Sequence, residues 1–281
     1  MTENPKVLYP IEPWSVTETG FCIENNYRNE TVFALSNGYL GTRGTWEEAY
    51  DFDVTQGMEG NFINGFYESE PIRYGECCYG FPANSQTLLN LPNAKGILLR
   101  LPNGEVFSMQ TGSMSHYRRT LHLDRGLVTR TLEWTSPQGL RIRLLTERLV
   151  SFSDKRLMAI HYTVCPLNFS GTLTLTCLLD GDVCNHTRVT NPLIDYGPYE
   201  RSLLIEQLTA DESGLFLLGR TKHSGLSMAC MTRSVIDAPS AVIYSTDGLC
   251  ACAKYTVNAV EGVSVRLTKY IAYVSFPDIT V

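Results

Sequence analysis

Strict alternation of apolar and polar residues is the feature that most constrains how this chain folds. The run TLTLTCLL, from Thr172 to Leu179, alternates almost without a break, and the run from Arg141 sets two arginines against Ile142 and Leu144. The run VSVRLTKYIAYV puts five apolar residues on one face: Val263, Val265, Leu267, Ile271 and Tyr273. Period two is typical of strands with one face in a core and the other in water. The chain is therefore predicted to consist mainly of half-buried antiparallel strands.

Turn residues separate these alternating runs. Asn103-Gly104 lies between two apolar runs and predicts a hairpin with a type I′ turn, in which both central residues take positive φ. The sequences TSPQG, NFSG, KHSG and STDG divide the later runs, and no run after residue 95 keeps an apolar period of 3.6 over three helical turns. We predict an all-β fold, a large antiparallel β-sandwich, with long loops between residues 46 and 95 over one sheet.

Composition and charge narrow the functional classes. The 281 residues are 43% hydrophobic, enough for a large core, and carry a formal net charge of −6. This balance argues against nucleic acid as a partner, because nucleic-acid surfaces are strongly basic. The densest basic stretch is interleaved with Asp124 and Glu133 and is interpreted as a solvated strand surface; it contains Arg118, Arg119, Arg125 and Arg130.

The N-terminal sequence and the cysteines indicate in which cellular compartment the chain is expected. The start, MTENPKVLYPIEPW, lacks the basic cap and apolar run of a secretory signal. No apolar run approaches the roughly 18 residues of a membrane span. The nine cysteines form no CxxC pair, and no zinc-binding spacing is present. We expect reduced thiols, no bound metal, no membrane partner and a cytoplasmic location.

The stretch FALSNGYLGTRGTWEE, from Phe33 to Glu48, carries three glycines at a spacing of three. A phosphate-binding loop is excluded, since neither the P-loop pattern nor a glycine-rich turn between a strand and a helix is present. The overlapping run ETVFAL is predicted to form a strand and Ser36 to Gly38 a turn. Gly41 and Gly44 are expected where a close neighbour leaves no room for a side chain.

The run ENNYRNETVFALSNGYLGTRGTWEE, preceded by Trp14 and Phe21, strongly resembles the N-terminal domain of glycoside hydrolase family 65. The likeness continues through NFINGFYE, YGECCYGFPANSQTLLNLPN, LPNGEVFSM, LDRGLVTRTLEWTSPQGLRIRLLTERLVSF and LTLTCLLDGDV, and so covers nearly the whole chain. Ser36 is a departure, because relatives often carry glycine before Asn37-Gly38. The family contains inverting phosphorylases of maltose, trehalose, kojibiose and nigerose, together with acid trehalases.

This resemblance implies a super-β-sandwich similar to galactose mutarotase, with residues 1–281 as one N-terminal domain. In the family an (α/α)6 barrel follows and carries the general-acid glutamate and the phosphate-binding residues; no such helical sequence is present here. Inorganic phosphate takes the nucleophile's place in a phosphorylase, so it is a co-substrate of the intact enzyme and no cofactor is expected. The chain alone is expected to have no catalytic residue and no activity. Its expected partners are its own catalytic barrel and a second copy in a homodimer. The α-glucosidic disaccharide is expected to be bound by the intact enzyme.

Several residues are candidates for a site. Trp46, Glu47 and Tyr67 are candidates for substrate binding, and Asn37, Gly38, Gly41, Arg43 and Gly44 form the structural motif. Glu47 and Glu48, near Asp51 and Asp53, either contact a sugar or form a solvated turn after Trp46. Arg43 is expected to pair with a carboxylate in a two-point bond that fixes the loop. The aromatic residues of the loop-rich segment form either a carbohydrate platform or core and domain-interface packing: Trp46, Phe62, Phe66, Tyr67, Tyr74, Tyr79 and Phe81.

Metal binding and other functions are weaker hypotheses. Asp180 and Asp182 suggest a calcium loop, but Cys184 and Asn185 break its pattern, so a hairpin turn is expected. The five histidines show no metal-binding spacing: His116, His122, His161, His186 and His223. Three alternatives stay open, namely a free-standing carbohydrate-binding module, a mutarotase-like enzyme that pairs one histidine with a carboxylate, and a purely structural interaction domain.

Overall fold

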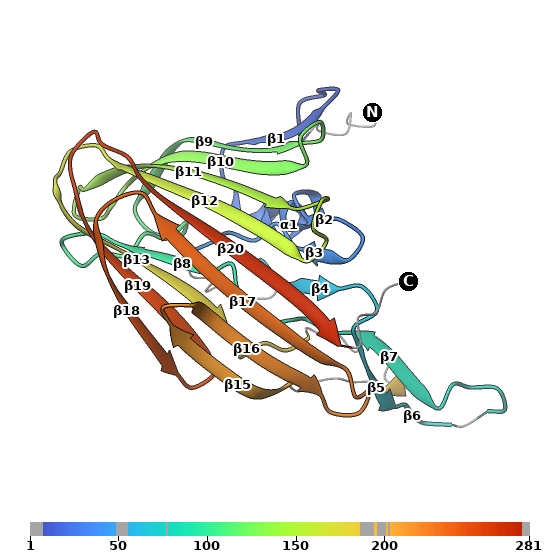
Figure 1. Ribbon diagram of the computed structural model, residues 1–281. Helices are drawn as coiled ribbons and strands as arrows, with labels where there is room; N and C mark the ends of the chain where they lie inside the picture. Colours follow the sequence, from blue (N-terminus) through green and yellow to red (C-terminus); the bar gives the residue numbers. More distant parts are fainter. Residues whose placement is uncertain are drawn as a thin grey trace, which may run out of the picture.

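Long antiparallel strands dominate the computed structural model, which describes residues 8–48, 56–76, 78–185, 194–195, 201 and 203–276 (Figure 1). The large sheet has nine strands, in the order β1 (Ser15–Thr19), β9 (Ser113–His122), β10 (Leu127–Thr135), β11 (Arg141–Val150), β12 (Leu157–Pro166), β20 (Val265–Phe276), β17 (Ser227–Ile236), β16 (Gly214–Thr221) and β15 (Leu203–Asp211). The small sheet has four, in the order β18 (Ser240–Asp247), β19 (Cys250–Ala259), β13 (Gly171–Asp180) and β8 (Ile97–Arg100). The predicted antiparallel β-sandwich is confirmed.

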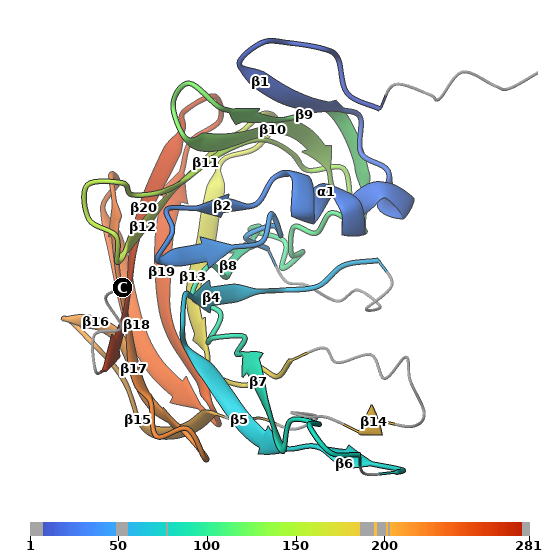
Figure 2. The same cartoon turned by 90° about the vertical axis from the view of Figure 1, so that its right-hand side faces the viewer.

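The shorter elements lie together on one side of the large sheet, as Figure 2 shows. They are η1 (Ile23–Asn25), α1 (Asn26–Val32), β2 (Leu35–Ser36), β3 (Leu40–Thr42) and β4 (Asn61–Ile63). Beyond them β5 (Tyr67–Pro71) pairs with β7 (Asn84–Leu88), and β6 (Arg73–Tyr74) pairs with β14 (Ile194–Asp195), in a ribbon that projects from the body (Figure 1). Neither helix of the described residues has the length and hydropathy of a membrane span.

Alternation predicts the buried faces of the long strands well. In β13 the buried positions are Leu173, Leu175, Cys177 and Leu179, as the pattern indicates. In β20 two positions differ from the prediction. Val263 lies in the turn before the strand and is 55% exposed, whereas Lys269 shares the buried face and is fully buried. The core therefore contains a charge that the apolar pattern does not reveal.

One local prediction holds only in part, and another is wrong. The run ETVFAL is a strand only at Leu35, where β2 begins, because Glu30 to Val32 complete α1; Glu30 is fixed there by bonds to Met58 and Arg43. The hairpin at Asn103 is not type I′, since among the described non-glycine residues only His116 has positive φ. Pro102 imposes negative φ, so a type I turn forms and only Gly104, at φ 90°, is left-handed.

Candidate functional site

Three arginines line the inner face of the large sheet on neighbouring strands. Arg119 of β9 lies directly opposite Arg130 of β10, and Arg148 of β11 lies diagonally across from Arg130. Each is at most 4% exposed. The interpretation of the basic stretch as a solvated surface is therefore wrong for Arg119 and Arg130, although Arg118 and Arg125 are exposed.

Glu47 and Glu48 supply the negative charge that these arginines need. Glu47 lies 3.0 Å from Arg130 and 3.3 Å from Arg148, and Glu48 lies 2.6 Å from Arg130. Tyr162 of β12 donates a hydrogen bond to Glu48 at 3.0 Å. Burial lowers the pKa of Arg130, but the two carboxylates outweigh that effect and raise it above its ordinary value. Both glutamates are 3% exposed, so the solvated-turn interpretation is wrong.

The same arginines hold the backbone of the loop. Arg119 donates to the carbonyl of Gly44 at 2.9 Å, and Arg148 donates to the carbonyl of Thr45 at 2.8 Å. Arg119 also pairs with Glu18 of β1 at 2.8 Å. The cavity left among these side chains is about 10 Å³, which is room for one water molecule and not for a sugar ring or a phosphate. Residues 44–48 are thus a buried anchor, held from several strands of the sheet.

A second buried ion pair lies beside this loop. Lys95 pairs with Glu59 and donates to Thr42 at 2.8 Å and to Asn61 at 3.0 Å. Thr45 donates to Glu59 at 2.5 Å, which links the pair to the arginine-held loop. Burial lowers the pKa of Lys95, and Glu59 offsets this only in part. Burial raises the pKa of the Glu59 carboxyl, but the Lys95 ammonium outweighs it and the net direction is downward. Neither Lys95 nor Glu59 belongs to a recognisable motif of the sequence.

Asn37 and Gly38 form the predicted turn. The side-chain oxygen of Asn37 accepts hydrogen bonds from the backbone N–H groups of Tyr39 at 3.0 Å and Leu40 at 2.9 Å. Its amide nitrogen donates to the carbonyls of Ser151 at 2.6 Å and Lys155 at 2.9 Å, which ties the turn to the connection between β11 and β12 of the large sheet. Gly38 has φ 89°, the left-handed region that glycine occupies without strain.

For the other motif residues, Gly41, Arg43 and Gly44, some predictions are confirmed and others are wrong. A Cβ atom at Gly44 would lie 2.9 Å from the backbone of Phe33, so the predicted close approach is confirmed there. At Gly41 the nearest atom would be 3.6 Å away, an ordinary contact, so the prediction is wrong for that glycine. Arg43 pairs with Glu30 at 3.4 Å, which confirms the expected carboxylate partner. The bond is a single contact, because the Nε atom donates to the carbonyl of Met58 at 2.9 Å instead.

The aromatic residues separate into a buried and an exposed group. Trp46 is 4% exposed and meets Phe21 edge-to-face at 5.1 Å, and Phe66 is fully buried. Tyr79 and Phe81 are fully and half exposed, on the projecting ribbon. Phe62, Tyr67 and Tyr74 are of intermediate exposure. Substrate contact by Trp46, Glu47 and Tyr67 stays a prediction; Trp46 and Glu47 are already engaged within the domain.

Glu68, next to Tyr67, fixes the base of the projecting ribbon. Its carboxylate is fully buried and accepts hydrogen bonds from three consecutive backbone N–H groups, those of Lys222 at 2.8 Å, His223 at 3.1 Å and Ser224 at 2.7 Å. Such a set of N–H groups is a strong partner for an anion. The sequence gives no local sign of this role, because the donors lie more than 150 positions away.

The geometry of the described residues does not support a calcium loop at Asp180 and Asp182 or a catalytic pair of a histidine and a carboxylate. Asp182 pairs with Arg201, and within the described residues no group of three or more His, Cys, Asp or Glu side chains is placed to hold a metal ion. His161 lies 3.6 Å from Glu147, and the two groups touch each other instead of standing on opposite sides of a sugar-sized space. Asp51, Asp53 and His186 lie outside the described residues.

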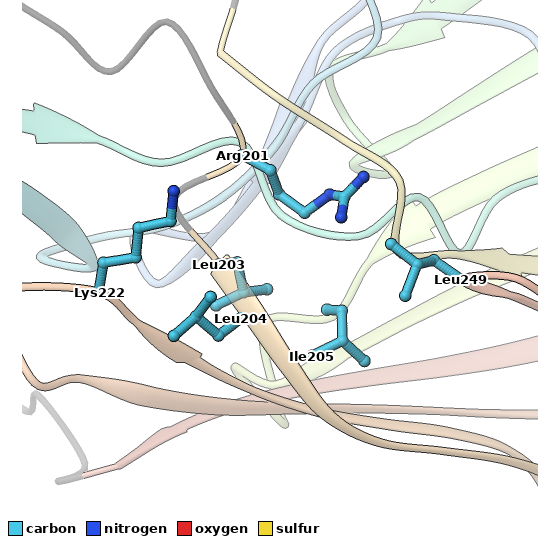
Figure 3. Close-up of a pocket in the computed structure, with 6 residues that line it drawn as sticks. All are labelled: Arg201, Leu203, Leu204, Ile205, Lys222 and Leu249. Atoms are coloured by element: carbon cyan, nitrogen blue, oxygen red, sulfur yellow. The ribbon is translucent and has the colours of Figure 1, made fainter.

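A wide hollow lies at the edge strand β15. It has a volume of about 460 Å³ and an apolar floor of Leu203, Leu204, Ile205 and Leu249. Figure 3 shows the side chains of Arg201 and Lys222 at its border. Arg201 is already paired with Asp182, so this hollow offers an apolar floor and one committed cation. Among the described residues that line it there is no carboxylate, so they do not supply the pair of acidic groups that glycoside cleavage needs.

A nine-stranded sheet that faces a four-stranded one, with buried arginines and glutamates paired on its inner face, defines the class of large antiparallel β-sandwich domains. The chain belongs to the glycosyl hydrolase family 65 N-terminal domain family, whose sequence model matches residues 16–280. It is 35% identical to the alpha,alpha-trehalose phosphorylase of Thermoanaerobacter brockii over 98% of this chain and 36% of that protein. It is 31% identical to the kojibiose phosphorylase of Halothermothrix orenii over 61% of this chain and 20% of that protein.

A solved structure confirms the fold independently. The putative kojibiose phosphorylase from human microbiome superimposes with a TM-score of 0.84 over 98% of this chain and 34% of that chain, at 18% sequence identity. The chain therefore spans about a third of the length of the trehalose phosphorylase and of this solved relative.

Proposed function

We propose that this chain is the non-catalytic N-terminal domain of an inverting disaccharide phosphorylase that acts on α-glucosidic disaccharides such as trehalose, kojibiose or maltose. The observation that carries the proposal is the 35% identity to a trehalose phosphorylase along 98% of the chain. In this proposal the domain supports the active site of a helical barrel and takes part in dimerisation, and the intact enzyme works in the cytoplasm with inorganic phosphate as co-substrate.

The buried charges support a non-catalytic role. Inverting cleavage needs a carboxylic acid at the leaving oxygen and a nucleophile on the opposite face of the sugar. Glu47 and Glu48 are committed to arginines, so neither is available as the acid. Arg119, Arg130 and Arg148 resemble a phosphate clamp, but Glu18, Glu47 and Glu48 match their charge and the 10 Å³ cavity excludes phosphate.

A chimera tests the proposal directly. In the trehalose phosphorylase of Thermoanaerobacter brockii, the matching N-terminal third is replaced by this chain, and release of glucose 1-phosphate from trehalose is measured. We expect activity from the chimera and none from this chain alone. The assay is repeated with kojibiose and maltose to find which disaccharide the chimera accepts. Glucose 1-phosphate production by the chain alone, or a folded chimera without activity, would overturn the proposal.

One observation favours a second function, that of a carbohydrate-binding module. Tyr79 and Phe81 are exposed on the projecting ribbon, and the Phe81 ring lies 5.0 Å from that of Tyr74. Exposed aromatic faces pack well against pyranose rings. Calorimetric titration of the chain with trehalose, kojibiose and maltose tests this function. Binding that disappears in a variant with Tyr79→Ala and Phe81→Ala would support it, and absence of binding would exclude it for these sugars.

A further inference from the structure

The projecting ribbon is joined to the sandwich by few contacts. Among the described residues, β5 and β7 pair with each other over five positions, β6 pairs with β14, and none of these four strands pairs with a strand of the large or the small sheet. Only one residue of β5 and β7, Glu68, is buried. A two-stranded ribbon is at most marginally stable by itself in water. The ribbon therefore keeps its place through the few side chains that attach it.

The buried attachment is the Glu68 carboxylate, which lies on the turn between β16 and β17. It accepts hydrogen bonds from the backbone N–H groups of residues 222–224 at 2.7 to 3.1 Å, and a further one from the N–H of Ser69 at 2.9 Å. The Ser224 hydroxyl donates to the carbonyl of Tyr67 at 2.6 Å. Consecutive N–H groups that face one carboxylate form an anion-binding concavity, and bonds to a charged acceptor are roughly twice as strong as neutral ones. We call this contact the Glu68 latch.

The root of the ribbon lies in the core. Phe66 is fully buried and Leu89 is 2% exposed, and the N–H of Leu89 donates to the carbonyl of Phe66 at 3.2 Å. Next to this pair the Asn185 side chain donates to the carbonyl of Leu88 at 2.7 Å, a bond between neutral groups. The root therefore fixes where the ribbon leaves the body, and the Glu68 latch fixes the direction in which it projects (Figure 1).

We propose that the projecting ribbon is a separate opening unit. It is docked while the Glu68 carboxylate occupies the N–H groups of residues 222–224, and it moves away from that turn when the carboxylate leaves, with both sheets of the sandwich still folded. Segments with few buried apolar contacts open at a lower free energy than the whole domain. Tyr79 and Phe81 are exposed farther along this ribbon, so the latch decides how these rings are presented. Such opening is a property of this chain alone and does not depend on the proposed phosphorylase activity.

Two measurements of hydrogen exchange by mass spectrometry test the separate opening. In the unchanged chain the amides of β5 and β7 should exchange at a rate that depends little on urea, since opening of the ribbon exposes little apolar surface. Leu175→Ala, a buried change in the small sheet, should accelerate exchange in β12 and β13 and leave that of β5 and β7 unchanged. It destabilises elements that stay folded when only the ribbon opens. A steep urea dependence in the ribbon, or equal acceleration there in Leu175→Ala, would overturn the proposal.

The variant Glu68→Gln tests the latch, because it keeps the shape of the side chain and removes its charge. We expect the amides of β5 and β7 to exchange at least about 10-fold faster. Glu70→Gln is the matched control, two positions along β5 and only half-buried, and should change this exchange by less than about 2-fold. A second variant, Glu68→Ala, leaves the three N–H groups of the turn without their carboxylate. Sodium formate should then slow the exchange of the ribbon again, and sodium chloride at the same concentration should not.

Each outcome with these variants decides whether Glu68 is the latch. Ribbon exchange in Glu68→Gln that equals that of the unchanged chain, or equal acceleration in Glu70→Gln, overturns this role. A Glu68→Gln variant that loses the circular dichroism of the folded sheets overturns it as well, since Glu68 would then hold the whole domain together. If formate does not slow the exchange in Glu68→Ala, the turn does not bind a carboxylate as an anion, and the latch is likewise overturned.

Discussion

Arg130 holds the buried loop through two carboxylates, and its replacement gives the first prediction. Arg130→Met keeps an apolar chain of similar length but removes the arginine that pairs with Glu48, and leaves Glu47 with Arg148 alone. Breaking a buried ion pair from one side leaves an uncompensated charge and costs about 3–5 kcal/mol. We expect the free energy of unfolding, measured by urea denaturation at pH 7, to fall by that amount.

The control for this prediction lies on the same sheet. Arg143 pairs with Glu133 at 2.8 Å, but its side chain is 60% exposed. Arg143→Met should therefore lower the free energy of unfolding by less than about 1 kcal/mol. Equal losses for the two variants would show that burial of the Arg130 network adds nothing to stability.

Lys269 gives a prediction about pH. It is fully buried, and its ammonium donates to the carbonyls of Gly96 at 3.0 Å and Leu178 at 2.7 Å without forming an ion pair among the described residues. Burial lowers its pKa from the ordinary 10.5 to about 8. Between pH 8 and 10.5 the unfolded chain keeps this proton and the folded chain has lost it. The contribution of Lys269 to stability therefore rises with pH across this window.

Comparison with Lys269→Met isolates that contribution. The advantage of the methionine variant over the unchanged chain should be largest below pH 8 and should shrink as pH rises, by about 3 kcal/mol over the full window. The measurement is the free energy of unfolding in urea at several pH values. Lys254→Met on the exposed face of β19 is the control and should show a difference that does not change with pH. A difference that is equally flat for Lys269→Met would contradict the lowered pKa.

At the scale of elements, the chain from β3 into the buried loop passes so close to Phe33 at Gly44 that no side chain fits there. Gly44→Ala places a Cβ atom 2.9 Å from the backbone of Phe33, whereas Gly41→Ala places one 3.6 Å from the Cβ of Ser36. Overpacking against backbone costs about 1–3 kcal/mol, so Gly44→Ala should lower the melting temperature clearly and Gly41→Ala should change it little. Thermal denaturation of the two variants measures this. A Gly44→Ala variant as stable as Gly41→Ala would mean that α1 and the loop can move apart.

The same elements show what the sequence could and could not predict. Alternation placed Leu173 and Leu175 inward because apolar burial follows strand parity alone. Parity also places Arg130 on the inner face, between Val128 and Leu132, but a buried charge needs a partner. That partner, Glu47, lies 83 positions away, so the buried network becomes visible only in the folded structure. The turn at Asn37 was predictable, since its hydrogen bonds to Tyr39 and Leu40 are local.

On the scale of the whole molecule, two different sets of elements cover the inner face of the large sheet: the small sheet covers one half, and the buried loop with α1 covers the other half. The inner face of β20, β17 and β16 meets the small sheet, and the inner face of β9, β10 and β11 meets the buried loop and α1. Neighbouring strands β12 and β20 connect the two halves through eight pairs of residues. Because both covers share a continuous sheet, the loss of either one exposes the apolar face of strands that support the other.

This arrangement predicts a single cooperative unfolding transition. Trp46 is buried in the half that the loop covers and reports on that half by fluorescence once the other two tryptophans, Trp14 and Trp134, are replaced by phenylalanine; circular dichroism reports on all strands. Leu175→Ala, a fully buried change in the small sheet, should cost about 2–5 kcal/mol. It should shift the fluorescence and dichroism curves in urea by the same amount, although Leu175 belongs to the other half. A fluorescence transition that stays in place while the dichroism curve shifts would show that the two halves unfold separately, and that the large sheet does not couple them.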